Sequence, residues 1–207
     1  LPVQAGGRAR SDRDPHPMNY HPAVYAADIA LMLEGLGTAR AQFVGTSMGG
    51  VITMALAFSH PAMVAGAVLN DVGPLVATEG LERIASYLGK PVSIPDWQAA
   101  TDYVRENNAH ALPRYGPAQW KRMARRLFRE GADGRPELDY DLAIAEPIRA
   151  AAGLPAPDLW PFFEALARGR PLTVIRGETS DLLDPATLAE MRQRAPHMHA
   201  AEVPGVG

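Results

Sequence analysis

The segment Gly45-Thr46-Ser47-Met48-Gly49 matches the pattern G-x-S-x-G, in which a sharp turn between a strand and a helix lifts a serine hydroxyl out of the fold. A serine held in this way can attack a carbonyl carbon as a nucleophile. The backbone N–H of Met48, at the start of the helix, would point to where an oxyanion forms. Glycines two positions before and after Ser47 are expected to avoid clashes between the crossing elements. The simpler alternative is a glycine-rich turn with an incidental serine, or a weak phosphate loop.

The elements that must position Ser47 can be predicted from the pattern of apolar residues. Short apolar runs bounded by turn residues indicate buried strands, and apolar residues at a spacing of three to four indicate helices. Strands are predicted at 41–44, 64–69, 172–175 and 199–203, and helices at 22–36, at 51–58 and after the cap signal Asp184-Pro185. Short strands that alternate with helices are typical of a parallel α/β sheet.

The stretch from Leu75 to about Arg170 has a different pattern of apolar residues. They recur at helical spacing, no clear strand is visible, and all three tryptophans lie here. We therefore predict an α/β core formed by 1–74 and 166–207, with an inserted helical cap over 75–165. Within that core, residues 1–18 are expected to form a loop.

Composition excludes several classes of protein. Apolar residues make up 47% and charged residues 21% of the 207 residues, as in ordinary globular chains. The net charge of −3 comes without a basic block, so no nucleic-acid partner is expected. No apolar run approaches the ~18 residues of a membrane span, and the absence of cysteine excludes disulfides and thiolate chemistry and suits the cytoplasm. With only Lys90 and Lys121 as lysines and abundant alanine, the composition is typical of a GC-rich bacterial genome.

The sequence resembles the α/β-hydrolase fold superfamily. The resemblance rests on S-D-R from Ser11, GTSMGG at the elbow, LNDVGP after the second strand, RGETSDLL and the final VPGVG. It is strongest for helical-capped bacterial hydrolases with a serine nucleophile, which include esterases, lactonases and C–C bond hydrolases. The resemblance implies hydrolysis of a carboxylic ester or related carbonyl compound through an acyl-enzyme on Ser47, with a small-molecule substrate and no metal or cofactor.

The resemblance also suggests the acid of a catalytic triad. Such an acid usually follows the strand after the cap, and Asp181 is our choice there, although its spacing from Gly177 is one residue longer than the commonest pattern. Asp71, at the end of an earlier strand, is the alternative acid. Glu178 is expected to be structural.

The catalytic histidine is expected immediately after Gly207, so the chain itself lacks it. None of its six histidines fits the role: His16, His21, His60, His110, His197 and His199. The first strands of the family would precede Leu1, which suggests a central piece of a hydrolase that is close to inactive. The strand 41–44 would then be an exposed sheet edge, which favours a homo-oligomer.

Aromatic residues of the cap could line an apolar substrate pocket, and Tyr87 and Trp160 are the predicted contacts. The arginines at 122, 125, 126 and 129 are interpreted as one solvated helix face. A second hypothesis is a non-catalytic protein of this fold that binds an apolar small molecule under its cap. A third, nucleotide binding at GTSMGG, predicts stabilisation by nucleotides.

Overall fold

The computed structural model describes residues 2–151, 153–154 and 157–207. These residues form two compact units. The helical unit holds the described residues of 1–20 and 85–152 together with Val206, and the sheet unit holds 21–84, the described residues of 153–205, and Gly207.

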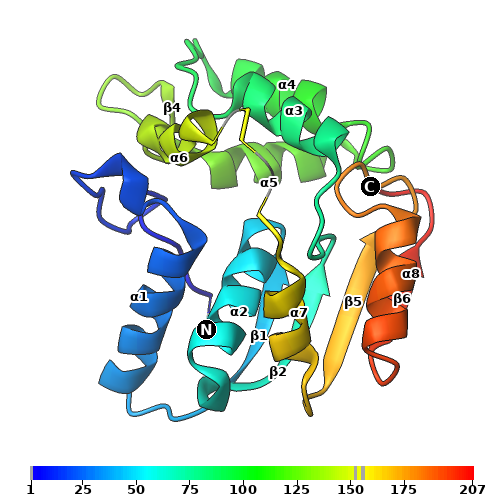
Figure 1. The fold of residues 1–207 in the computed structure, drawn as a ribbon. Helices are drawn as coiled ribbons and strands as arrows, with labels where there is room; N and C mark the ends of the chain where they lie inside the picture. Colours follow the sequence, from blue (N-terminus) through cyan, green and yellow to red (C-terminus); the bar gives the residue numbers. More distant parts are fainter. Residues whose placement is uncertain (1, 152, 155–156) are drawn as a thin grey trace. The chain divides into compact units, whose positions relative to one another are not determined.

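The sheet unit is built on four parallel strands, which lie side by side in the order β1-β2-β5-β6 (Figure 1). They are β1 (Ala41–Thr46), β2 (Val64–Asn70), β5 (Leu172–Gly177) and β6 (His199–Val203), so all four predicted strands are confirmed. The register pairs Thr46 with Asn70, Asn70 with Ile175, and Gly177 with Val203. The carboxyl ends of the four strands therefore meet at one edge of the sheet, where parallel α/β folds bind their ligands.

Four helices flank this sheet: α1 (Pro22–Gly35), α2 (Met48–Ser59), α7 (Trp160–Ala167) and α8 (Pro185–Arg194), with a short 3₁₀ turn η2 (Pro61–Met63). Helices α1, α2 and α8 were predicted for the core, whereas α7 begins within the segment assigned to the cap. Helix α2 packs against both α1 and α7, and Leu56, Phe163 and Leu166 are fully buried there. Helix α8 begins at the predicted cap, where Asp184 Oδ1 accepts a hydrogen bond of 2.8 Å from Thr187 N. This backbone hydrogen bond lowers the pKa of Asp184.

The helical unit contains α4 (Trp97–Asn108), α5 (Pro117–Leu127), α6 (Glu146–Ala150), the 3₁₀ turns η1 (Pro17–Asn19) and η3 (Leu142–Ala145), and the hairpin β3 (Phe128–Glu130) with β4 (Pro136–Leu138). Its core is formed by Ala100 and Val104 of α4, Ala124 of α5 and Phe128 of β3. The expectation of helices without strands was wrong at the hairpin. Strands of three residues are too short to show an alternating pattern.

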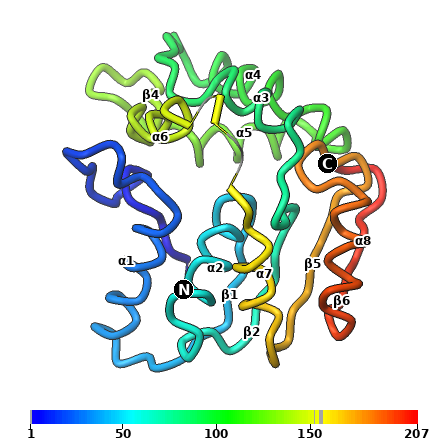
Figure 2. The backbone as a smooth tube through the Cα atoms, in the orientation of Figure 1, coloured from blue at the N-terminus to red at the C-terminus, as the bar shows by residue number. Residues whose placement is uncertain are grey.

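The boundaries of the two units differ from the predicted domain boundaries. Residues 2–20 associate with the helical unit, because Ala9 N donates to Asp139 O (2.8 Å) and Asp141 N donates to Gly7 O (2.7 Å). Figure 2 shows this N-terminal segment beside α6. Helix α3 (Thr78–Tyr87) contains the other boundary. In the described part of the chain, no helix is long and apolar enough to cross a membrane.

Candidate active site

Ser47 lies at a strained turn between β1 and α2, as the motif predicts. Its backbone has φ 49° and ψ −119°, a left-handed conformation that non-glycine residues rarely adopt and that is often found at functional sites. Ser47 N donates to Asn70 O (3.0 Å), which ties the turn to the end of β2. The Ser47 hydroxyl makes no capping hydrogen bond to α2, so it is not used as part of the helix end.

Two glycines make this turn possible, but they are not the pair expected from the motif. A Cβ atom on Gly45 would lie 2.4 Å from Gly49 O, and a Cβ on Gly50 would lie 2.3 Å from Val72 Cγ1. A Cβ on Gly49, by contrast, would meet nothing within 4 Å. The close approach of β1 and α2 therefore requires Gly45, whereas Gly50 is required where α2 meets Val72 after β2; the steric role assigned to Gly49 was wrong.

Met48 is the first residue of α2, so its N–H has no partner within the helix. The helix dipole adds a partial positive charge at the same place. This N–H is available to stabilise an anionic oxygen that forms next to Ser47 Oγ.

Asp71 occupies the corresponding position at the end of the neighbouring strand. It follows β2 directly, and its φ of 57° is also left-handed. Its carboxylate accepts two hydrogen bonds from neutral donors, Gly177 N on Oδ1 (3.2 Å) and Ser180 Oγ on Oδ2 (2.8 Å). Because Thr46 pairs with Asn70, the residues that follow them, Ser47 and Asp71, leave adjacent strands at the same sheet edge.

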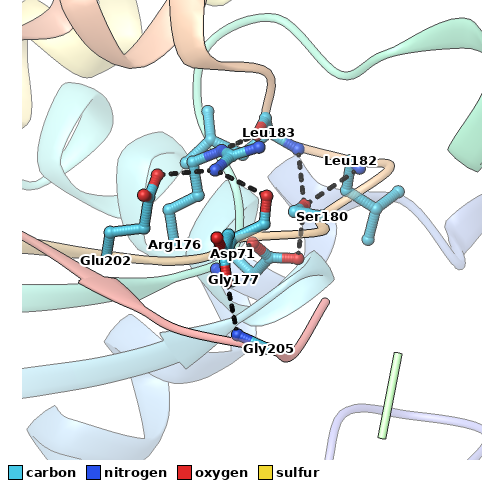
Figure 3. A network of polar contacts seen from close by, with 9 residues as sticks. Asp71, Arg176, Gly177, Ser180, Leu182, Leu183, Glu202 and Gly205 are labelled. Atoms are coloured by element: carbon cyan, nitrogen blue, oxygen red, sulfur yellow. Dashed lines mark hydrogen bonds and ion pairs between the residues drawn. The ribbon is translucent and has the colours of Figure 1, made fainter. Parts of the chain in front are cut away.

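Ser180 fixes the orientation of Asp71, a role that no sequence pattern predicted. Its hydroxyl oxygen accepts from Leu182 N and Leu183 N, both at 3.1 Å, and the hydroxyl proton is donated to Asp71 (Figure 3). A hydroxyl has one proton, so this arrangement fills its capacity as a donor. In the sequence, the only indication of this role was that Ser180 directly precedes Asp181 in RGETSDLL.

Arg176 holds the loop that carries Ser180. It is buried, with 4% of its surface exposed. Its Nε donates to Leu183 O (2.6 Å), and its Nη1 donates to Glu178 O (3.2 Å) and to Glu202 Oε2 (2.7 Å). The guanidinium group thus joins both ends of the loop to β6 (Figure 3).

Asp181 is engaged in a different interaction. Arg83 of α3 donates to both of its carboxylate oxygens, from Nε to Oδ2 (2.5 Å) and from Nη2 to Oδ1 (2.9 Å). The approach is close, since a Cβ on Gly80 of α3 would lie 2.4 Å from Asp181 O. The charge of the Asp181 carboxylate is therefore compensated by a guanidinium.

Glu178 has the structural role expected of it, because its Oε2 accepts a hydrogen bond from Gly205 N (2.6 Å) in the turn after β6.

Three histidines make contacts away from Ser47 and Asp71: His21 caps α1, His60 Nδ1 contacts Ser59 Oγ at 2.9 Å, and His197 Nε2 contacts Ala167 O at 2.7 Å. Among the described residues, no hydrogen bond joins a histidine to Ser47 or Asp71.

A cavity of about 640 Å³ lies within the helical unit, and Tyr87, one of the two predicted substrate contacts, is among the residues that line it. Trp160 does not line this cavity. It is buried in the sheet unit, with its ring edge-on to Phe163 (5.8 Å between centroids) and the Arg194 guanidinium 3.9 Å above it. The described residues contain no group of three or more His, Asp or Glu side chains that could hold a metal ion.

Comparison with known proteins identifies the family. The sequence model described as "Alpha/beta hydrolase family" matches residues 1–207. The chain is 37% identical to the 3-hydroxybutyrate-oligomer hydrolase of Cupriavidus necator, over 97% of this chain and 70% of that protein. It is 27% identical to the 2-(acetamidomethylene)succinate hydrolase of Mesorhizobium japonicum, over 99% and 70%.

Solved structures give the same result. An α/β hydrolase from Novosphingobium aromaticivorans superimposes with a TM-score of 0.90 and 43% identity, over 99% of this chain and 71% of that one. The elbow at Ser47, the parallel sheet and the match along the whole sequence lead to one conclusion: the chain belongs to the α/β hydrolase family.

Proposed function

We propose that this chain is a serine hydrolase of carboxylic esters or related carbonyl compounds that acts through an acyl-enzyme on Ser47. The observation that carries the proposal is the left-handed backbone of Ser47, between β1 and α2, with a hydroxyl that does not cap the helix. A residue holds such a conformation only where the surrounding structure enforces it. Relatives named as hydrolases of an oligomeric ester and of a succinate derivative support the reaction class.

The reaction has two halves. Ser47 Oγ attacks the substrate carbonyl while a general base takes its proton, and the Met48 N–H stabilises the tetrahedral oxyanion. The base then returns the proton to the leaving alcohol, which leaves the acyl group on Ser47. Water, deprotonated by the same base, attacks the acyl-enzyme, and the base then returns this proton to Ser47 Oγ as the bond to the acid product breaks.

Asp71 is the better-supported acid of the triad. A triad acid stabilises a positively charged imidazole, and this requires a negative charge that no other cation compensates. The Asp71 carboxylate is held by the neutral donors Gly177 N and Ser180 Oγ. The Asp181 carboxylate is instead paired with Arg83, which favours a role in fixing α3.

The base of the proposed triad is a histidine in the turn after β6, as the family resemblance implies. The hydrogen bond between Glu178 and Gly205 supports this, because it secures that turn beside the loop that holds Asp71. A chain with one histidine added after Gly207 tests the position of the base.

Fluorophosphonate labelling, followed by intact mass and peptide mapping, tests the nucleophile. We expect slow labelling of Ser47 in the 207-residue chain and rapid labelling in the chain with the added histidine. Loss of a triad histidine lowers kcat by up to ~10⁶. The Ser47→Ala chain is the control and should take up no label at the elbow.

The alternative function is a non-catalytic protein that binds a small molecule. The cavity inside the helical unit favours it, because that cavity is formed without any residue of the elbow. An absence of labelling in both chains, with an intact fold, would select this alternative and reject the hydrolase.

We also propose that a second copy of the chain pairs with β1. In the sheet of the described residues β1 is an edge strand, and Val44 at its centre is 78% exposed. An unpaired edge of this kind is a template for strand pairing.

A further inference from the structure

The cavity of the helical unit has a positive lining. Its walls come from the N-terminal segment, α4, α5 and the residues after β4, and its volume of about 640 Å³ is in the range of small-molecule sites. Three arginines face it, Arg8, Arg122 and Arg126, against a single carboxylate, Asp139. A site with this balance favours an anionic ligand.

The arginines of α5 and the following strand are all exposed, as expected for a solvated face, but they make different contacts. Arg125 stacks on Trp97, 3.4 Å from the ring centroid, and Arg129 pairs with Glu137 at 3.1 Å. In contrast, Arg122 and Arg126 line the cavity. No carboxylate of the described residues forms an ion pair with either of them.

The positions of Arg122 and Arg126 destabilise helix α5 slightly. Residues four apart lie on the same helical face, and two like charges at this spacing destabilise a helix slightly. An anion between the two guanidinium groups would remove the repulsion and accept hydrogen bonds from both. Guanidinium groups match the planar geometry of a carboxylate particularly well.

The remaining wall is aromatic. Tyr87, Tyr103, Tyr115 and Tyr140 all line the cavity. Burial raises the pKa of both Tyr103 and Tyr140, so these phenols remain neutral hydrogen-bond donors at neutral pH. Their rings offer an apolar surface for a short hydrocarbon chain or ring.

We propose that this cavity binds a monocarboxylate with an apolar body, with its carboxylate between Arg122 and Arg126 and its body against the tyrosines. The binding site itself rests only on residues of the helical unit.

Binding of 4-phenylbutyrate, measured by isothermal titration calorimetry on the full chain, tests the site. The neutral probe 4-phenylbutyramide has nearly the same shape and no charge. We expect the acid to bind about tenfold or more tightly than the amide, because charge-assisted hydrogen bonds to arginine are roughly twice as strong as neutral ones. Equal binding of the two probes, or no binding of the acid, would overturn the proposal.

Matched variants locate the carboxylate. The double variant R122M/R126M should lose the preference for the acid but keep the weak binding of the amide. Lys121→Met removes a neighbouring cation from α5 that does not line the cavity, and it should leave both affinities within about twofold. An equal loss in the Lys121→Met chain would show that only general charge matters, and would also overturn the site. Circular dichroism melting verifies that each variant is folded.

The fluorophosphonate experiment separates this inference from the proposed function. The label has no carboxylate and reports on Ser47 alone. Selective acid binding without labelling would retain the site and reject the hydrolase, whereas labelling without acid selectivity would reject the carboxylate preference and retain the hydrolase.

Discussion

Backbone conformation at single residues indicates where this chain places its chemistry. Ser47 and Asp71 both have positive φ, 49° and 57°, and each follows a strand of the same parallel pair. Such conformations cost about 1–3 kcal/mol each. Their occurrence at two adjacent strand ends is difficult to explain by folding alone, and it supports a site at this edge of the sheet.

Replacing each candidate acid by its amide should distinguish Asp71 from Asp181. In the chain with the added histidine, we expect Asp71→Asn to slow fluorophosphonate labelling by about 10³–10⁴, because an amide cannot stabilise an imidazolium. Asp181→Asn should change the labelling rate less than about threefold. It should lower the free energy of unfolding by ~1 kcal/mol or less, because the pair with Arg83 is partly exposed (28% and 22%).

One result would reverse the assignment of Asp71 as the triad acid. If Asp181→Asn abolished rapid labelling and Asp71→Asn did not, Asp181 would be the acid and Asp71 a residue that holds the loop. Urea unfolding of both variants is needed, so that loss of labelling is not confused with loss of the fold.

At the scale of elements, the elbow depends on how closely β1 and α2 approach. We expect Gly45→Ala to destabilise the chain by about 3 kcal/mol or more, because its Cβ would lie 2.4–2.6 Å from backbone atoms of Gly49 and Gly50. Gly49→Ala places its Cβ in open space inside a helix. It should stabilise the chain by roughly 0.5–1 kcal/mol through helix propensity.

Chemical unfolding of both variants measures these changes in stability. The two variants serve as controls for each other. The change from glycine to alanine is the same, so a difference in sign can come only from the two positions. Equal destabilisation by the two substitutions would mean that the turn needs backbone freedom at Gly49 as well, and that close packing at Gly45 is not the main constraint.

The main elements were predictable, and the reasons for the exceptions are physical. The strand before Ser47 and the helix after it were visible because buried strands and helices leave a periodic apolar pattern. The pair of Arg83 and Asp181 was not visible, since its members are 98 positions apart and ion pairs follow no period. The arginines of α5 looked alike in sequence, yet Arg125 covers Trp97 while Arg122 lines a cavity.

For the whole molecule, the division into units depends on contacts that the sequence does not mark. The N-terminal segment was predicted to belong to the core, within residues 1–74. Its backbone is instead bonded to Asp139 and Asp141, far along the chain, through an isolated bridge between Arg8 and Tyr140. Contacts between distant segments of this kind fix domain boundaries, and composition gives no sign of them.

The exposed edge at β1 predicts self-association of the whole chain. We expect sedimentation velocity to show a concentration-dependent dimer, with the two β1 strands paired across a two-fold axis. Val44→Lys would place like charges in that pairing and should weaken the dimer about tenfold, which corresponds to ~1.4 kcal/mol. Leu31→Lys, on the exposed surface of α1 (66% exposed), is the control and should leave the dimer unchanged. A monomer at every concentration would reject the pairing, and an equal effect of both substitutions would move the interface away from β1.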